Sequence, residues 1–220
     1  MQFIFCENSG NNSILLKGEL YNYIFKVRRH KSDEVLNFRN PNSPKIIYRY
    51  SVESIDRRKA KLKLEISFED FIEPEKKITL GWCVVDIKTI EKTLPMINEL
   101  GVQTIHFIYC KYSQKDIKLD FERLNKILQN SSMQSGRYDI TKLSLSDSLD
   151  SFLENFPKTI AIDFSDEKLG EIDKNHISIL IGAEGGFSQD EREKFKTVKG
   201  LKSPYILKSQ TAVISAISLI

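Results

Sequence analysis

Residues 177–191 read Ile177-Ser178-Ile179-Leu180-Ile181-Gly182-Ala183-Glu184-Gly185-Gly186-Phe187-Ser188-Gln189-Asp190-Glu191. An apolar strand here runs into three glycines within five positions, and the Ser-x-x-Glu spacing that follows predicts the start of a helix. Glycine at a strand end lets the backbone turn sharply and lie open to a ligand. The loop has neither the Gly-x-Gly-x-x-Gly spacing of dinucleotide sites nor a Gly-Lys-Ser/Thr sequence. It therefore predicts either a ligand-binding loop of another kind or a glycine-rich turn that binds nothing.

Strand and helix patterns alternate around this loop from residue 71 onwards. Apolar segments predict strands at 78–85, 104–109, 159–163, 177–181 and 205–207. Helical spacing of apolar residues predicts helices over 90–100 and 121–128. This alternation is typical of an α/β domain with a mostly parallel sheet, which we expect over 71–220. Such sheets bind ligands beyond the carboxyl ends of their strands.

Residues 1–70 have a different pattern, dominated by short strands. Apolar and polar residues alternate over 60–68, the period of a half-buried strand, and 45–52 is a candidate partner. Leu20, Ile24 and Val27 have the spacing of one helix face. We therefore expect two domains, a small β-barrel with one helix at 1–70 and the α/β domain at 71–220.

Positive charge is concentrated in the first of these domains. The whole chain carries a formal charge of +3, while residues 1–70 hold 13 Lys and Arg against 9 Asp and Glu. The cationic residues fall mainly in two clusters, 26–31 and 57–63. Such clusters either contact phosphates or form an ordinary solvated face.

The positions of the cysteines and histidines and the length of the apolar runs exclude several classes of protein. Cys6, Cys83 and Cys110 are far apart and odd in number, so we predict neither a disulfide framework nor a zinc site, but small apolar residues in strands. The three histidines are equally dispersed, which predicts no bound metal. No apolar run approaches the roughly 20 residues of a membrane helix, and the first residues do not resemble a signal peptide. We expect a cytoplasmic protein without a membrane partner.

Five stretches together resemble one known family, the SPOUT-class 16S ribosomal RNA (uridine-N3) methyltransferases. The glycine loop at 181–187 matches the family's Ile-Gly-Pro-Glu-Gly-Gly-Phe, with Ala183 in place of proline. The other stretches occur in the family's order and extend over nearly the whole chain: 23–29, 99–102 (Glu-Leu-Gly-Val), 134–137 (Gln-Ser-Gly-Arg) and 203–212. The last stretch departs from the family at Ser203, Tyr205, Lys208 and Gln210. Lys208 keeps the positive charge of arginine but loses its planar fork.

The resemblance implies a fold and a cofactor. It implies a C-terminal SPOUT domain with a trefoil knot, preceded by a PUA-like RNA-binding β-barrel, in a homodimer. The final segment, 211–220, would be the last helix, packed in the knot and against a second subunit; a buried core helix is equally consistent with its sequence. S-adenosylmethionine would lie in the knot, held by Ile181, Gly182, Gly185, Gly186, Ile206, Leu207, Thr211 and Ala212.

The implied reaction, methyl transfer to uracil N3, requires particular groups at the site. Uracil N3 carries an imide proton at neutral pH, so the site needs a proton acceptor and positive charge near the developing oxygen anions. The candidates are Glu184 as base, and Arg137 and Lys208 as electrostatic groups. Water could accept the proton instead, Glu184 could only hold the loop, and Arg137 could be an ordinary surface residue. Contacts to 16S ribosomal RNA of the small subunit would come from Lys26, Arg28, Arg29, Arg57, Arg58 and Lys59.

Three other functions stay open on the sequence. The departures at Tyr205, Lys208 and Gln210 fit a non-catalytic RNA-binding protein that keeps the fold. A methyltransferase acting on a different RNA is equally compatible, because the fold hosts many targets. The third is an α/β enzyme acting on a free nucleotide or small metabolite, which would leave the basic clusters without a role.

Overall fold

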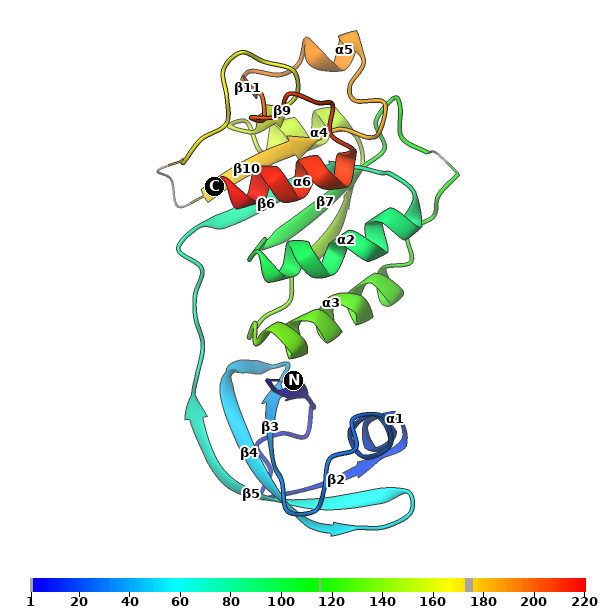
Figure 1. The fold of residues 1–220 in the computed structure, drawn as a ribbon, viewed down its shortest axis with the longest axis vertical. Helices are drawn as coiled ribbons and strands as arrows, with labels where there is room; N and C mark the ends of the chain where they lie inside the picture. Colours follow the sequence, from blue (N-terminus) through cyan, green and yellow to red (C-terminus); the bar gives the residue numbers. More distant parts are fainter. Residues whose placement is uncertain (1, 115, 173–175) are drawn as a thin grey trace. The chain divides into compact units, whose positions relative to one another are not determined.

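The computed structural model describes residues 2–114, 116–172 and 176–220 and is drawn in Figure 1. The chain divides into two units, Met1–Glu73 with Ser132–Asp139, and Pro74–Ser131 with Ile140–Ile220. Within the described residues, no helix is long and apolar enough to cross a membrane.

The first unit is built on a five-stranded sheet in the order β1-β3-β4-β5-β2. The sheet is antiparallel except for the parallel pair β1 and β3. Two register shifts between β4 and β5, near Arg49 and Ser54, are irregularities of the kind that bend a strand, and Figure 1 shows both strands curving. Phe38, Tyr50 and Leu62 are fully buried inside the curve. The strands are β1 (Ile4–Phe5), β2 (Ser13–Lys17), β3 (Val35–Asn40), β4 (Ser43–Ile55) and β5 (Lys59–Glu69).

The alternation in β5 predicts the strand correctly but not the burial of its second half. Ala60 and Leu62 are buried, whereas Ile66 is 53% exposed and Phe68 is 37% exposed. The pairing with β4 shifts register between Leu64 and Ile66, so the regular inward alternation is interrupted there.

The helix of the first unit differs from the prediction because it changes type. It begins as a short α-helix, α1 (Gly18–Tyr21), and continues as a π-helix, η1 (Asn22–Val27). A π-helix has a wider turn, so residues spaced for an α-helix no longer share one face. Ile24 is fully buried, but Val27 is 67% exposed.

The second unit contains a six-stranded sheet in the order β11-β9-β10-β6-β7-β8. Every pair in it is parallel, which confirms the predicted parallel sheet. Leu80, Trp82, Ile179 and Leu180 in its two central strands have no exposed surface. The strands are β6 (Lys77–Cys83), β7 (Thr104–Ile108), β8 (Lys142–Ser146), β9 (Ile160–Ile162), β10 (His176–Ile181) and β11 (Val198–Lys199).

Two helices, α2 and α3, lie where the apolar spacing predicts them, and α4 was not predicted. Ile90, Leu94 and Ile97 form the buried face of α2, while Leu100 lies just past its end and is 39% exposed. α2 packs against α6, and α4 packs against β7 and β8. The helices are α2 (Ile87–Glu99), α3 (Phe121–Ser135), α4 (Leu149–Asn155), α5 (Gln189–Arg192) and α6 (Ser209–Ser218).

The strand predicted at 205–207 is wrong. The chain between β11 and α6 is irregular, and Tyr205 and Ile206 are 81% and 82% exposed. Pro204 has no N–H to donate to a sheet, and the apolar residues after it do not enter the core. The last strand of the sheet is β11, which precedes this segment.

The cysteines also differ from the prediction. Cys83 and Cys110 form a disulfide, with Cα atoms 5.7 Å apart, and Cys6 is free. Cys83 ends β6 and pairs with Ile108 of β7, so Cys110, two residues further on, lies beside it. The separation of 27 residues in sequence contains no information about this register.

Candidate active site

The glycine loop that follows β10 is a tight turn. The N–H of Gly186 donates a hydrogen bond of 2.9 Å to the carbonyl oxygen of Ala183. Gly186 has φ of +69°, in the left-handed region that favours glycine. A Cβ atom at Gly182 would lie 3.1 Å from the backbone of Gly186, tighter than most real Cβ contacts. The turn therefore favours glycine at both positions.

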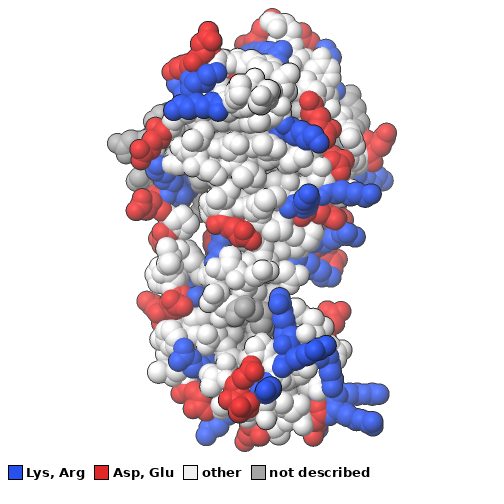
Figure 2. Space-filling model, in the orientation of Figure 1, with Lys and Arg blue, Asp and Glu red and all other residues white. Residues whose placement is uncertain are grey.

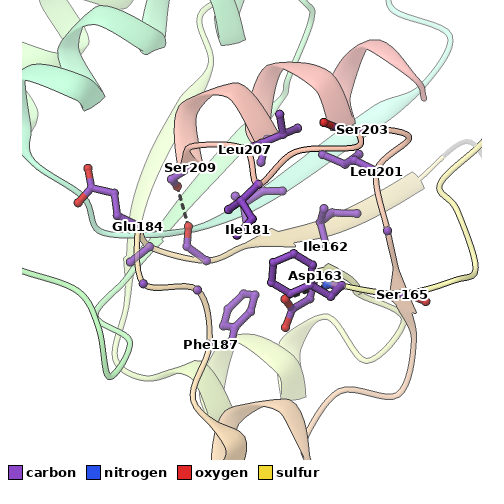
Figure 3. A pocket seen from close by; sticks show the side chains of 18 of the residues that line it. Ile162, Asp163, Ser165, Ile181, Glu184, Phe187, Leu201, Ser203, Leu207 and Ser209 are labelled. Carbon is purple, nitrogen blue, oxygen red and sulfur yellow. Dashed lines mark hydrogen bonds between the residues drawn. The ribbon is translucent and has the colours of Figure 1, made fainter.

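The start of α6 is joined to this loop by a buried hydroxyl. Ser209 Oγ donates a hydrogen bond of 2.6 Å to the carbonyl oxygen of Gly182, drawn as a dashed line in Figure 3. Trp82 Nε1 donates to the same Oγ at 2.9 Å. The central strand β6, the glycine loop and α6 are thus held in one arrangement.

A buried carboxylate holds the far side of the loop. Glu191 Oε2 accepts the N–H of Ser188 at 2.8 Å, and Oε1 accepts the N–H of Lys111 at 2.8 Å. Glu191 is only 9% exposed. It therefore joins the segment after β7 to the first turn of α5.

A pocket of about 660 Å³ opens beside the glycine loop, at the carboxyl edge of the sheet. Three segments enclose it: the end of β9 with 163–168, the glycine loop, and 200–212 (Figure 3). Ile181 and Leu207 give it apolar walls, and the exposed Phe164, Tyr205 and Ile206 border it. Large exposed apolar side chains around a hollow are typical of a ligand site.

An ion pair lines the same pocket. Arg192 Nε donates to Asp163 Oδ2 at 2.6 Å, and Nη2 donates to Oδ1 at 3.3 Å. The hydrogen bond to Asp163 raises the pKa of Arg192 above its usual value. The pair connects the end of β9 with the end of α5.

Seven of the eight residues proposed for the cofactor line this pocket: Ile181, Gly182, Gly185, Gly186, Ile206, Leu207 and Ala212. Thr211 lies one residue before Ala212 and is exposed. Glu184 also lines the pocket and is exposed to solvent. Lys208 is the exposed residue immediately before α6, between the lining residues Leu207 and Ser209.

Arg137 belongs to the first unit. Its Nε donates to Asp139 Oδ1 at 2.6 Å, and its side chain is only 10% exposed. The structure thus brings Glu184 to the pocket and Lys208 next to it, and places Arg137 in a separate unit with its own acidic partner.

The basic residues predicted to contact RNA gather in the first unit, where Figure 2 shows Lys and Arg concentrated on one side. A shallow groove is lined by Lys17, Lys26, Asp56, Arg57, Arg58 and Lys59. Arg28 stacks over the ring of Tyr23 at 5.3 Å. Lys17 is an addition to the predicted set, since an isolated lysine in β2 gives no signal of its own.

Sequence reasoning missed several residues of the pocket, among them Asp163, Arg192 and Ser209. Asp163 ends a predicted strand, and the rule that ligands bind at carboxyl edges could have selected it. Arg192 follows the Ser-x-x-Glu pattern directly, but nothing in the sequence relates it to Asp163. Ser209 gives no signal, because its partners are distant in sequence.

A parallel sheet with a glycine loop bordering a pocket at its carboxyl edge defines an α/β protein with a candidate ligand site in the position usual for such sheets. Residues 73–220 match the family model described as RNA methyltransferase domain. The chain is 33% identical to the ribosomal RNA small subunit methyltransferase E of Helicobacter pylori over 224 aligned positions, covering 100% of this chain and 99% of the relative. The enzyme of the same name from Aquifex aeolicus is also 33% identical, over 97% of this chain and 96% of the relative.

Two solved structures have the same fold over nearly the whole chain. A methyltransferase of Legionella pneumophila with bound S-adenosylmethionine has a TM-score of 0.83 at 22% identity, covering 99% of this chain and 95% of the other. A ribosomal RNA small subunit methyltransferase E of Neisseria gonorrhoeae, also bound to S-adenosylmethionine, has a TM-score of 0.83 at 18% identity, with the same coverage. This protein belongs to the RNA methyltransferase family, among the relatives of ribosomal RNA small subunit methyltransferase E.

Proposed function

We propose that this protein transfers the methyl group of S-adenosylmethionine to N3 of one uridine in the 16S ribosomal RNA of the small subunit. The observation that carries the proposal is the pocket between the glycine loop and 200–212 at the carboxyl edge of the parallel sheet. The names of the full-length relatives support the substrate class, and the uridine N3 target follows from the resemblance of the motifs.

The residues of the pocket fit S-adenosylmethionine. A volume of about 660 Å³ lies in the range of small-molecule sites. Ile181, Ile206 and Leu207 offer apolar surface for an adenine ring, and Gly186 leaves its backbone open to close approach, since a Cβ there would meet nothing nearer than Arg192 Nη2 at 3.8 Å. We propose that the segment from β11 to α6 forms the trefoil knot around this cofactor.

The chemistry divides among three side chains. When bound, S-adenosylmethionine supplies an activated methyl group, so the protein has only to present a nucleophilic uracil. Glu184 accepts the imide proton from N3, because its carboxylate lines the pocket and reaches solvent. Lys208, beside the pocket, stabilises the negative charge that develops on the uracil oxygens. Arg137, held by Asp139, positions the RNA.

The first unit supplies affinity for RNA. We propose that it is a PUA-like barrel whose Lys26, Arg28, Arg29, Arg57, Arg58 and Lys59 contact phosphates. All six side chains are exposed, as phosphate contacts require. The protein works as a cytoplasmic homodimer, without a metal or a membrane partner, and α6 contributes to the subunit contact.

The test is methyl transfer to small ribosomal subunits purified from cells that lack this protein. With tritium-labelled S-adenosylmethionine, the protein incorporates label into 16S ribosomal RNA, and nuclease mapping finds N3-methyluridine at a single position. Subunits from cells that contain the protein are the matched control, because their target is already methylated and takes up no label.

Two variants separate chemistry from binding. Glu184→Gln and Lys208→Gln each lower the transfer rate by about a hundred-fold or more if their side chains act in the transition state. Calorimetry with S-adenosylmethionine shows unchanged cofactor affinity for both. Cofactor binding by the wild type without any transfer identifies a non-catalytic RNA-binding protein, and label in transfer RNA identifies a different target.

A further inference from the structure

The charged residues of the pocket are not equivalent. Asp163, Asp166 and Glu184 supply three carboxylates, and Lys168 and Arg192 supply two cations. Lys168 Nζ donates to the carbonyl oxygen of Ser165 at 2.8 Å, within its own loop. Arg192 is the cation that connects the end of β9 with the end of α5.

Asp163 fixes the position of this arginine. Its carboxylate is only 10% exposed, and Oδ1 also accepts the N–H of Phe164 at 2.9 Å. Two hydrogen bonds from the guanidinium reach the same carboxylate. A planar group held at two points keeps its orientation before any ligand arrives, so less entropy is lost on binding.

Arg192 keeps donors for a second anion. A guanidinium has more N–H groups than the two that Asp163 accepts. Its Nη2 lies 3.8 Å from the point that a Cβ of Gly186 would occupy, beside the glycine loop. The side chain is 40% exposed, so a ligand in the pocket can reach it.

We propose that Arg192 binds the carboxylate of the amino-acid part of S-adenosylmethionine, with Asp163 as its positioning residue. This inference rests on the proposed function. The adenine ring requires apolar surface, which Ile206 and Leu207 provide, whereas the carboxylate requires a planar cationic donor. Arg192 supplies that donor, and the neighbouring carboxylate of Asp166 suits the positive ammonium group.

The experiment compares two ligands by calorimetry on the full-length protein. Decarboxylated S-adenosylmethionine keeps the sulfonium and the amine but has no carboxylate. The wild type prefers S-adenosylmethionine over it by about tenfold or more. Arg192→Met removes this preference, lowering affinity for S-adenosylmethionine about tenfold while leaving affinity for the analogue unchanged. A merely structural role for Arg192 would weaken both ligands together.

Three further variants sharpen the result. Lys168→Met removes a cation from the same pocket and keeps the preference, whatever its effect on absolute affinity. Arg192→Lys retains part of the preference, because it keeps the charge without the fork. Asp163→Asn also retains part of it, because Arg192 remains but is no longer fixed.

The outcomes distinguish a failure of this inference from a failure of the proposed methyltransferase function. Equal affinity of the wild type for both ligands, or a full preference in Arg192→Met, overturns the role of Arg192 and leaves the methyltransferase assignment standing. If the wild type binds neither ligand, the proposed function fails and the inference fails with it. Loss of affinity for RNA alone in Arg192→Met assigns the arginine to an RNA phosphate and also overturns the proposal.

Discussion

Ser209 Oγ lies 2.6 Å from the carbonyl oxygen of Gly182 and donates a hydrogen bond to it, although 27 residues separate the two in sequence. Ser209 Oγ also accepts the indole N–H of Trp82, a fully buried residue in the middle of the sheet. The glycine loop is therefore held by α6 through Ser209, and Ser209 is in turn held by Trp82 of the core. The shape of the pocket depends on this contact.

Removing the hydroxyl should loosen the loop. Ser209→Ala leaves the buried N–H of Trp82 and the carbonyl of Gly182 without this partner, so we expect a loss of about 1 to 3 kcal/mol in the free energy of unfolding. Affinity for S-adenosylmethionine should fall as well. Urea denaturation and calorimetry measure the two effects. Ser218→Ala on the same helix is the control, since its exposed hydroxyl bonds only within the helix. Equal effects of both substitutions would contradict the role of Ser209.

Neutralising Glu191 should disturb the other side of the loop. Glu191→Gln keeps the size of the side chain but replaces one charged acceptor oxygen by an N–H donor, facing either Ser188 or Lys111. We expect about 1 to 2 kcal/mol of lost stability and weaker cofactor binding. Glu193→Gln, at an exposed position of the same segment, is the matched control. Unchanged stability of Glu191→Gln would show that its two hydrogen bonds do not hold the loop.

The half-buried His106 predicts a dependence of stability on pH. Burial lowers its pKa below the ordinary value of 6.5, and its surroundings are Ser146 Oγ at 3.3 Å and the rings of Phe152 and Phe156. Between the lowered pKa and 6.5, the unfolded chain binds more protons than the folded one, so stability falls as the pH falls through this window.

The test is denaturation from about pH 8 to about pH 5. His106→Gln removes this contribution, so its free energy of unfolding declines less steeply below about pH 6.5 than that of the wild type. His176→Gln, at an exposed position, retains the decline. A decline of the same size in all three proteins would assign the pH dependence to other groups.

Reversing charge in the first unit should separate RNA binding from cofactor binding. Arg28→Glu with Arg29→Glu weakens binding to small-subunit RNA and reduces its salt dependence, because fewer counterions are released. Affinity for S-adenosylmethionine stays unchanged. Filter binding over a salt series and calorimetry measure the two. Lys88→Glu with Lys92→Glu, on the exposed face of α2, changes the net charge equally and should affect RNA less. Equal loss of RNA and cofactor binding would refute the division of labour.

Local patterns predicted most of the strands and helices, whereas contacts between distant residues could not be predicted from them. The apolar run ending at Ile181 and the glycines after it predict a strand and an open turn, because both follow from the properties of single residues. Tyr205, Ile206 and Leu207 resemble a strand equally well, yet they lie outside the sheet. Tertiary structure makes the difference, because these side chains line the pocket and do not pack in the core.

The charged part of the site depends on register, which periodicity does not specify. Asp163 and Arg192 meet across 29 residues, and their contact requires both the end of β9 and the short helix α5 to be in place. The disulfide between Cys83 and Cys110 is missed for the same reason. The resemblance to a family supplied the cofactor and the reaction. The Ser-x-x-Glu spacing predicts the contact of Glu191 with Ser188, whereas its contact with Lys111 and the contact of Trp82 with Ser209 became visible only in three dimensions.

All the segments that border the pocket come from 162–212, the part of the chain that is translated after both long strands of the first unit and after α2 and α3. During synthesis, the first unit can therefore emerge before the residues that line the pocket have been made. A polypeptide that stops before Ser209 would carry the cationic first unit without the hydroxyl that fixes the glycine turn. On the division of labour proposed above, such a fragment keeps the residues for RNA contact and lacks the complete cofactor pocket, so premature termination would produce a competitor of the enzyme and not only a loss of it.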